Sequence, residues 1–436
     1  MKKLHLLLAA LLVLAVPAQA ANIIIVNVDG AGEGFNDPTP ATPVGGNPGT
    51  TIGEQRLNLF QEAANIWGSI LDSDVTIRVR SSFDPLSCDA SGGVLGSAGP
   101  IVVFDEFPGQ EYPFTWYHGA LANKRAGFDL DPGNDDIRAR FNVDIDNNDA
   151  CLNGTNWYYG FDGNAGGDIA LLPVLLHEMG HGLGFSSFVD ESDGSEFLGQ
   201  TDVFSRFIFD TSQGLTWEQM TDGQRATSAV NDGNLVWNGD GVNDYAPVFL
   251  AGTPKLFVNS PGTLPATMPI GQASFGPTLS AAGVAGEVVL VDDGVAPGSD
   301  GCSALVNGAE VAGKIALIDR GTCTFSSKAL NAQNAGAIAV IIVDNVAGAT
   351  PPGLGGSDPG LAIPTVSLTL ADGNLIKAEL GTGVNVTLGL DDSELAGADP
   401  QGRVKLYAPN PVRPGSSISH FDVSAFPNLL MEPAIN

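Results

Sequence analysis

Two histidines four residues apart, His177 and His181, lie near the end of an apolar segment that runs from Leu171 to Leu183. The spacing of the apolar residues predicts a helix, and residues four apart share one helix face. Both imidazoles can therefore bind one metal ion, and zinc is the ion that this spacing favours. Glu178 lies beside them, where its carboxylate can take a proton from a metal-activated water. The pattern predicts a helix that carries part of a zinc site.

Local signals set the expected ends of this helix. Asp168 is placed to cap its N-terminus, and Pro173 suits its first turn, because proline lacks an amide hydrogen that the first turn would leave unbonded. Gly182 and Gly184 are expected to stop the helix, since glycine readily adopts the backbone conformation that follows a helix C-terminus.

The third protein ligand is not set by this motif. A catalytic zinc ion has three protein ligands and one open position, and the chain has three further histidines, His5, His118 and His420. The compact spacing of some zinc proteases places a histidine at position 187, where this chain has Ser187. The candidates are His118, His420 or a carboxylate. If His118 is not a ligand, we expect it to be structural or to face the substrate.

The segment His177–Ser186 resembles the zinc helix of leishmanolysin-type metzincins. In that family the third histidine follows an insertion, in a segment similar to Ser419–Asp422. A methionine turn comes shortly after it, similar to Asn428–Glu432. The resemblance implies that His420 is the third zinc ligand and that Met431 lies beneath the metal.

Two other families supply alternatives for the third ligand. Gly199–Asp202 resembles the aspartate-ligand segment of aspzincins, in which case Asp202 binds zinc. Glu191 or Glu196 could serve instead, as a glutamate does in thermolysin-like proteases. Gly184 favours the metzincin pattern, because that pattern needs a sharp turn directly after the helix.

A second resemblance concerns a region rich in glycine, alanine, valine and proline. The segments Val311–Phe325, Ala335–Ala337 and Ile363–Val366 resemble a protease-associated (PA) domain. A helix pattern over Phe325–Gln333 lies between short apolar strands, which gives a β-α-β unit. The resemblance implies an α/β domain without catalytic residues, which covers or recruits substrates or serves as a spacer. The expected strands of this region are Val288–Val291, Lys314–Ile318, Ala339–Val343 and Thr365–Leu368.

Other elements are expected nearer the N-terminus. Alternating apolar residues predict strands at Ile23–Val28, Val75–Val79 and Ile137–Val143. Apolar residues at helical spacing predict a helix through Leu57 and Trp67.

The N-terminal residues predict export. Two lysines precede an apolar run over Leu4–Val16, and Pro17–Ala20 supplies a cleavage site, which together are typical of a secretory signal peptide. The run is too short to span a bilayer, and no later segment is long enough. In an oxidising compartment the four cysteines are expected to form disulfides. Among the pairings that four cysteines allow, their grouping favours Cys88–Cys151 and Cys302–Cys323.

Acidic residues outnumber basic ones 49 to 19, a formal net charge of -30. A protein that binds phosphate backbones needs the opposite sign, so nucleic acid is excluded as a partner and anionic membranes are disfavoured. The segment 144–149 alternates acidic residues, which makes Asp144, Asp146 and Asp149 candidate calcium ligands. A solvated turn is the simpler interpretation of that segment.

Together these features predict an α+β protein, in which a metzincin-like zinc-protease domain with a mixed sheet and the zinc helix contains an inserted α/β PA domain. The expected boundaries are 1–20 for the signal peptide, 21–252 and 391–436 for the two parts of the protease domain, and 253–390 for the PA domain. The expected function is a secreted zinc endopeptidase that hydrolyses proteins or peptides, with Glu178 as general base. The alternative is a non-catalytic secreted protein that captures ligands through its PA domain.

Overall fold

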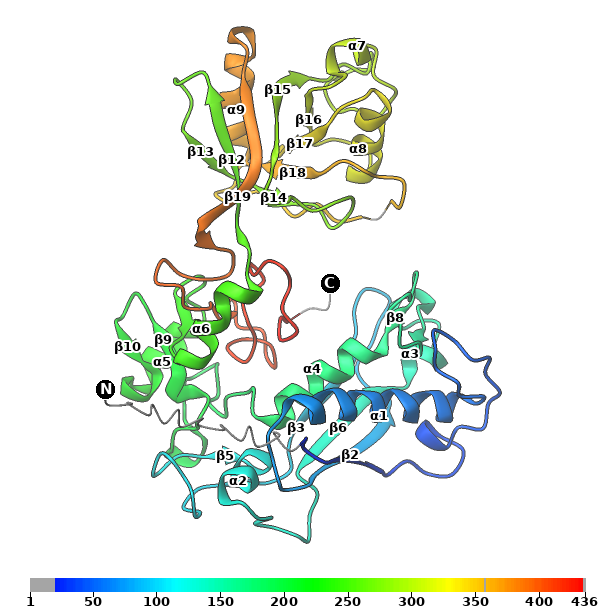
Figure 1. Ribbon diagram of the computed structural model, residues 1–436, viewed down its shortest axis with the longest axis vertical. Coiled ribbons are helices and arrows are strands. Elements are labelled where there is room, and N and C mark those ends of the chain that lie inside the picture. The colour runs from blue at the N-terminus through cyan, green and yellow to red at the C-terminus, as the bar shows by residue number, and fades with distance from the viewer. Residues whose placement is uncertain (1–19, 357, 434–436) are drawn as a thin grey trace, which may run out of the picture. The chain divides into compact units, whose positions relative to one another are not determined.

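The computed structural model describes residues 20–356 and 358–433, so the predicted signal peptide lies outside the described residues except at its last position. The chain divides into two compact units (Figure 1). The first contains the residues up to 238 together with 406–423 and those from 428 onward, and the second contains 239–405 with 424–427. The predicted insertion, 253–390, falls within the second unit.

A four-stranded sheet forms the N-terminal part of the first unit. Its strands lie in the order β1 (Ile23–Asn27), β2 (Ile77–Asp84), β6 (Ile137–Asn142) and β3 (Gly96–Pro100). The first three are parallel to one another, whereas β3 is antiparallel to β6 and forms an edge of the sheet. The sequence predicts three of these strands and misses β3, because Gly-Ser-Ala-Gly-Pro has no apolar alternation.

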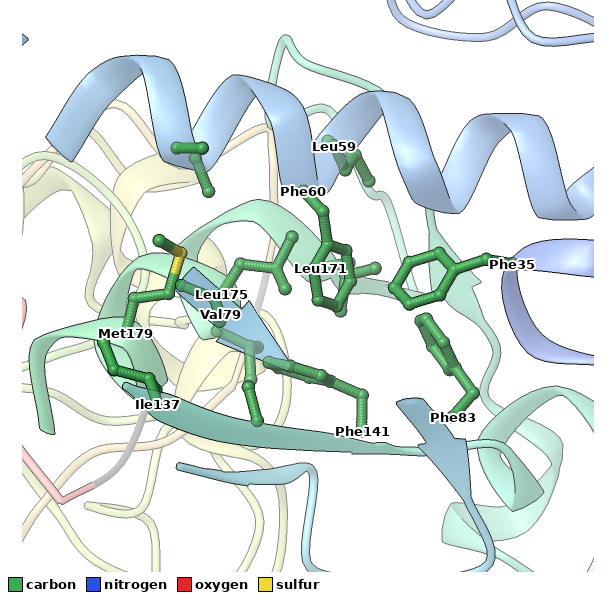
Figure 2. Close-up of a cluster of buried hydrophobic side chains, with 14 of the residues drawn as sticks. Phe35, Leu59, Phe60, Val79, Phe83, Ile137, Phe141, Leu171, Leu175 and Met179 are labelled. Atoms are coloured by element: carbon green, nitrogen blue, oxygen red, sulfur yellow. The ribbon is translucent and has the colours of Figure 1, made fainter. Parts of the chain in front are cut away.

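Two helices cover one face of this sheet. In α1 (Ile52–Ile70), Trp67 Nε1 donates a hydrogen bond to the Leu176 carbonyl of α4 (Leu171–Leu183) at 3.1 Å. Figure 2 shows side chains from both helices and from the strands pointing into one buried layer, which includes Leu59, Phe60, Val79, Phe83, Ile137, Phe141, Leu171, Leu175 and Met179. Burial of this layer holds α4 against the sheet and so positions the two histidines that the helix carries.

The helix α4 has the predicted bounds, but two of the predicted signals act differently. Asp168 does not cap it, because Ala170 occupies the N-cap position and the Asp168 carboxylate accepts a hydrogen bond from the Asn156 amide at 3.2 Å. Gly182 does not stop the helix either, since it lies inside it. Gly184, at φ 138°, is the residue at which the helix ends.

Short elements make up the rest of the first unit. They are β4 (Val103–Phe104), β5 (Tyr117–His118), α2 (Gly119–Ala126), α3 (Asp144–Asn147), β7 (Trp157–Tyr158), β8 (Ile169–Ala170), β9 (Ile208–Asp210), β10 (Leu215–Thr216), α5 (Asp222–Ser228) and β11 (Leu235–Trp237). A buried cluster joins the residues that follow α4 to the 406–421 segment, and the Leu406 amide donates to the Leu235 carbonyl at 2.9 Å. This packing brings the segment that carries His420 next to the region after α4.

The second unit is built on an eight-stranded sheet in the order β13-β12-β19-β15-β16-β17-β18-β14. Its four strands from β15 to β18 are parallel, and the remaining pairs are antiparallel. Ile315 and Leu317 of β16 face the core that includes α9, whereas Ala316 and Ile318 face the core that includes α8. The bounds are α6 (Asp240–Phe249), β12 (Gly252–Ser260), β13 (Thr267–Pro269), β14 (Gly271–Gln272), β15 (Val284–Leu290), α7 (Gly308–Val311), β16 (Ile315–Asp319), α8 (Phe325–Asn334), β17 (Ala339–Val343), β18 (Thr365–Leu368), α9 (Leu370–Glu379) and β19 (Asn385–Leu395).

Several predictions of local structure are confirmed. The β-α-β unit is present as β16, α8 and β17, and the two predicted disulfides, Cys88–Cys151 and Cys302–Cys323, both form. None of the helices in the described part of the chain combines the length and the apolar character that crossing a bilayer requires.

Candidate metal centre

The structure brings His177 and His181 of α4 together with His420. Their Nε2 atoms lie 3.1 Å apart between His177 and His181, 3.1 Å between His177 and His420, and 3.2 Å between His181 and His420. All three side chains are buried. Within residues 20–356 and 358–433 this is the group of side chains arranged to hold a metal ion.

The other nitrogen of each ring is held by a backbone carbonyl. His177 Nδ1 lies 2.7 Å from the Leu430 oxygen, His181 Nδ1 lies 2.7 Å from the Phe185 oxygen, and His420 Nδ1 lies 2.7 Å from an oxygen four residues earlier, that of Ser416. Because a carbonyl oxygen can only accept, each Nδ1 must carry the hydrogen and donate it. Each Nε2 is then left with a lone pair, and the three lone pairs face one another.

Burial favours the neutral form of these rings. It lowers the pKa of His177, and it lowers the pKa of His181 to about 4 and that of His420 to about 3. The neighbouring imidazoles act in the same direction for His181 and His420. The rings are therefore uncharged near neutral pH, which is the state that binds a metal.

This arrangement fits zinc. Zinc–nitrogen bonds of about 2.0–2.1 Å at tetrahedral angles separate two ligand nitrogens by about 3.3 Å, close to the spacing of the three Nε2 atoms. Three buried lone pairs at this spacing repel one another unless a cation lies between them. Carbonyls that accept from the outer nitrogen of each ligand are also the usual support of a histidine metal site.

Glu178 follows His177 on α4 and faces the edge strand β3. Its carboxylate accepts a hydrogen bond from the Ala98 amide, which lowers its pKa, but burial outweighs this contact and raises the pKa to about 7. A Cβ placed on Gly96 would lie 2.9 Å from the Phe141 ring and 3.1 Å from Glu178 Cγ, so glycine at this position leaves room for both side chains. A carboxylate with such a pKa can accept and return a proton near neutral pH.

Met431 packs against α4 between the positions of the two histidines. A Cβ placed on Gly180 would lie 2.7 Å from Met431 Sδ, and the Phe421 amide donates to the Met431 carbonyl at 2.8 Å. Since Leu430 holds the ring of His177, the 428–433 segment supports the helix and one of its histidines together.

The carboxylates considered as third ligands have other contacts. Asp202 is buried, and it accepts hydrogen bonds from two backbone amides and two serine hydroxyls. Glu196 forms an ion pair with Arg225 at 3.3 Å, and Glu191 accepts a hydrogen bond from the Gly415 amide at 3.2 Å. None of them joins the group of three histidines.

Two further sequence interpretations can be compared with the structure. His118 is fully buried, which is incompatible with a side chain that faces a substrate. The proposed calcium ligands gain no support, because Asp146 accepts hydrogen bonds from the Trp157 amide, the Arg56 guanidinium and the Tyr159 hydroxyl. Its oxygens are thus engaged by protein donors, including an ion pair with the buried Arg56 at 2.9 Å.

A cavity of about 740 Å³ lies beside the loop that follows α4. Its walls combine apolar side chains such as Phe188, Phe197 and Val412 with the carboxylates of Asp190 and Glu191. The loop is connected to the metal centre, because the Ser187 amide donates to the hydroxyl of the residue that precedes His420.

Comparison with protein families identifies part of the second unit. Residues 284–376 match the family model of the PA domain, which confirms the presence of that domain. The match covers the parallel strands β15 to β18 and the helices between them. A search of curated proteins gave no match.

Several solved structures show partial likeness. A zinc aminopeptidase from Bacillus subtilis is 26% identical, covers 33% of this chain and 31% of its own, and has a TM-score of 0.25. An aminopeptidase from Aneurinibacillus sp. strain AM-1 is 27% identical with coverages of 33% and 31% and a TM-score of 0.25. A peptidase M28 precursor from Shewanella amazonensis SB2B is 22% identical with coverages of 32% and 34% and a TM-score of 0.26. The chain thus spans about a third of each of these structures, and such TM-scores say nothing about the arrangement of the whole chain.

Proposed function

We propose that the chain is a secreted zinc-dependent endopeptidase of the metzincin type, with the PA domain inserted between the zinc helix and the third ligand. The observation that carries the proposal is the convergence of the Nε2 atoms of His177, His181 and His420. His420 is 239 positions from His181, so chance packing does not account for three rings that all turn the same nitrogen inward. The predicted signal peptide and the two disulfides support export.

The three histidines would hold a zinc ion, which would supply a Lewis acid for activating water and polarising the scissile carbonyl. Glu178 is the general base in this proposal, because it adjoins His177 and its pKa lies near neutrality. Its carboxylate takes the proton of the attacking water and returns it to the leaving amine.

The edge strand β3 supports an extended peptide as the substrate. Its inner side pairs with β6, and the Ala98 amide on this short strand already reaches the Glu178 carboxylate. A peptide that adds along the free side of such an edge is bound through its backbone and needs no free terminus. This geometry favours cleavage within a chain over removal of single N-terminal residues, and the 740 Å³ cavity has room for a substrate side chain.

The test uses an internally quenched peptide with an acetylated N-terminus, together with zinc analysis of purified protein. Wild type is expected to hold one zinc and to cleave the peptide, and a chelator is expected to stop cleavage. Glu178→Gln should retain zinc and lose turnover by roughly 10²–10⁴-fold, because it removes the base and no ligand. His420→Ala should lose both.

Glu191→Gln is the matched control, since it changes a nearby carboxylate that the thermolysin-like alternative uses as a ligand. It is expected to keep zinc. Loss of zinc in this control together with its retention in His420→Ala would overturn the ligand set. Zinc without any turnover in wild type would instead favour the binding protein.

A further inference from the structure

His118 is a buried polar residue close to the metal centre that the proposed function does not use. It lies at the end of β5 with none of its surface exposed, and its ring lies against Phe188 with centroids 4.5 Å apart. Its Nε2 lies 2.7 Å from Ser186 Oγ, whereas its Nδ1 is buried and has no hydrogen-bond partner among the described residues. An apolar side chain would fill this buried position without leaving a polar atom unpaired, so packing alone does not explain why a histidine is found there.

The partner of His118 is in a segment that connects two of the three metal histidines. The Phe185 carbonyl accepts from His181 Nδ1, and the Phe185 amide donates to the Gly180 carbonyl at 3.0 Å. Two residues later, the Ser187 amide donates to Ser419 Oγ at 3.1 Å, directly before His420. The segment Phe185–Ser187 therefore bridges the supports of His181 and His420, and Ser186 is its middle residue.

The bond to His118 acts on this bridge through the planarity of the peptide unit. The Phe185 carbonyl and the Ser186 amide belong to one rigid plane, so fixing Ser186 also fixes the direction in which the carbonyl points. That carbonyl decides where the ring of His181 lies and which nitrogen carries its hydrogen. Holding Ser186 in place is thus a means of aiming His181 Nε2.

We propose that His118 is a positioning residue of the metal centre, which acts on His181 and His420 through Ser186. This inference rests on the proposed zinc site but adds a residue that contacts neither the metal nor a substrate. Burial lowers the pKa of His118 to about 3, so the ring is neutral. Because a buried bare acceptor is tolerated better than a buried unpaired N–H, the hydrogen lies on Nε2, which donates to Ser186 Oγ.

The experiment measures metal binding directly rather than activity. Wild type, His118→Leu, His118→Gln and Ser186→Ala are titrated with zinc against a chelator of known affinity, and their Co²⁺ forms are compared by visible absorption. His118→Leu and Ser186→Ala should each weaken zinc binding by roughly tenfold and change the Co²⁺ bands, because the ligand geometry relaxes. His118→Gln keeps a donor at the same reach and should recover most of the wild-type affinity and spectrum.

Ser228→Ala is the matched control, because it removes a buried hydrogen bond of 2.9 Å to Trp217 Nε1 in the same unit without touching the metal histidines. It should leave zinc affinity and the Co²⁺ bands unchanged even if it lowers thermal stability. If His118→Leu fails to fold, the smaller change Ser186→Ala still decides the question. Wild-type affinity and spectrum in Ser186→Ala refute the role of His118. A wild type that binds no zinc refutes the proposed function itself.

Discussion

Replacing Gly182 with alanine tests how closely α4 must approach the sheet. A Cβ at this position would lie 2.4 Å from Ile137 Cγ2, 3.0 Å from its Cδ1 and 3.1 Å from its Cγ1. Ile137 is fully buried in β6, and Cγ2 is attached at the stiff branch of its side chain. Carbon atoms pack best at about 3.5–4.0 Å, so the helix or the strand must move by about 1 Å to admit the methyl group.

The expected magnitude follows from two opposing effects. Overpacking a filled core lowers the free energy of unfolding by about 1–3 kcal/mol. Alanine gains at most about 1 kcal/mol over glycine from its greater helix propensity, and less near a helix end. We therefore expect Gly182→Ala to destabilise the first unit by about 1–2 kcal/mol and to weaken zinc binding, because the neighbouring His181 moves with the backbone.

The assay is urea unfolding of the metal-free protein followed by tryptophan fluorescence. All five tryptophans precede residue 239, so this signal reports on the first unit. Gly223→Ala in α5 is the control, since no heavy atom lies within 4 Å of its Cβ position, and it should be neutral or slightly stabilising. The reasoning is refuted if Gly182→Ala is as stable as Gly223→Ala. It is also refuted if Gly182→Ala destabilises an Ile137→Ala background as much as it destabilises the wild type.

Three other predictions use different parts of the chain. Glu178→Gln should stabilise the metal-free protein by about 3 kcal/mol above pH 7, because the fold raises the pKa of this carboxyl from 4.5 to about 7. Urea unfolding at a series of pH values should show this gain fading as the pH falls from 7 to 4.5. Replacing Cys302 and Cys323 with alanine should lower the stability of the second unit by about 3 kcal/mol, because the unfolded chain is no longer constrained by a disulfide between residues 21 positions apart. An unchanged calorimetric transition would contradict this. Arg56→Met should lower the free energy of unfolding by about 1.5–3 kcal/mol, because the buried guanidinium loses its hydrogen bonds to the partly buried Asp146 carboxylate and to Tyr159, and a tryptophan-detected midpoint equal to wild type would contradict this.

The elements that sequence patterns predict are those that bury a regular apolar face. The bounds of β17 follow from an unbroken apolar run, and those of α4 follow from apolar residues at helical spacing. The edge strand β3 could not be found in this way, because glycine and serine pair through their backbones and leave no pattern in the sequence. Asp168 was a plausible cap by residue type, but the chain enters the helix from β8, which places Ala170 at the cap.

The candidate site is predictable only where chemistry is local. His177, Glu178 and His181 are read from five consecutive residues, whereas His420 depends on a family resemblance and on packing that joins distant segments. The carbonyls that orient the three rings leave no mark in the sequence, since every residue has one. The pairing of His118 with Ser186 is likewise visible only in three dimensions, because 68 positions separate the two.

The wide separation of the three ligands in sequence has a consequence for synthesis. The two ligand nitrogens on α4 are synthesised together, and the third follows 239 positions later, after residues 239–405 of the second unit. At about 5–20 residues per second, a growing chain carries an incomplete metal centre for roughly 10–50 s. During that interval residues 239–405 of the second unit can fold, while His177 and His181 of α4 lack their third ligand. A nascent or interrupted chain thus lacks the three-nitrogen site, which couples the onset of the proposed hydrolytic activity to synthesis of the polypeptide through His420.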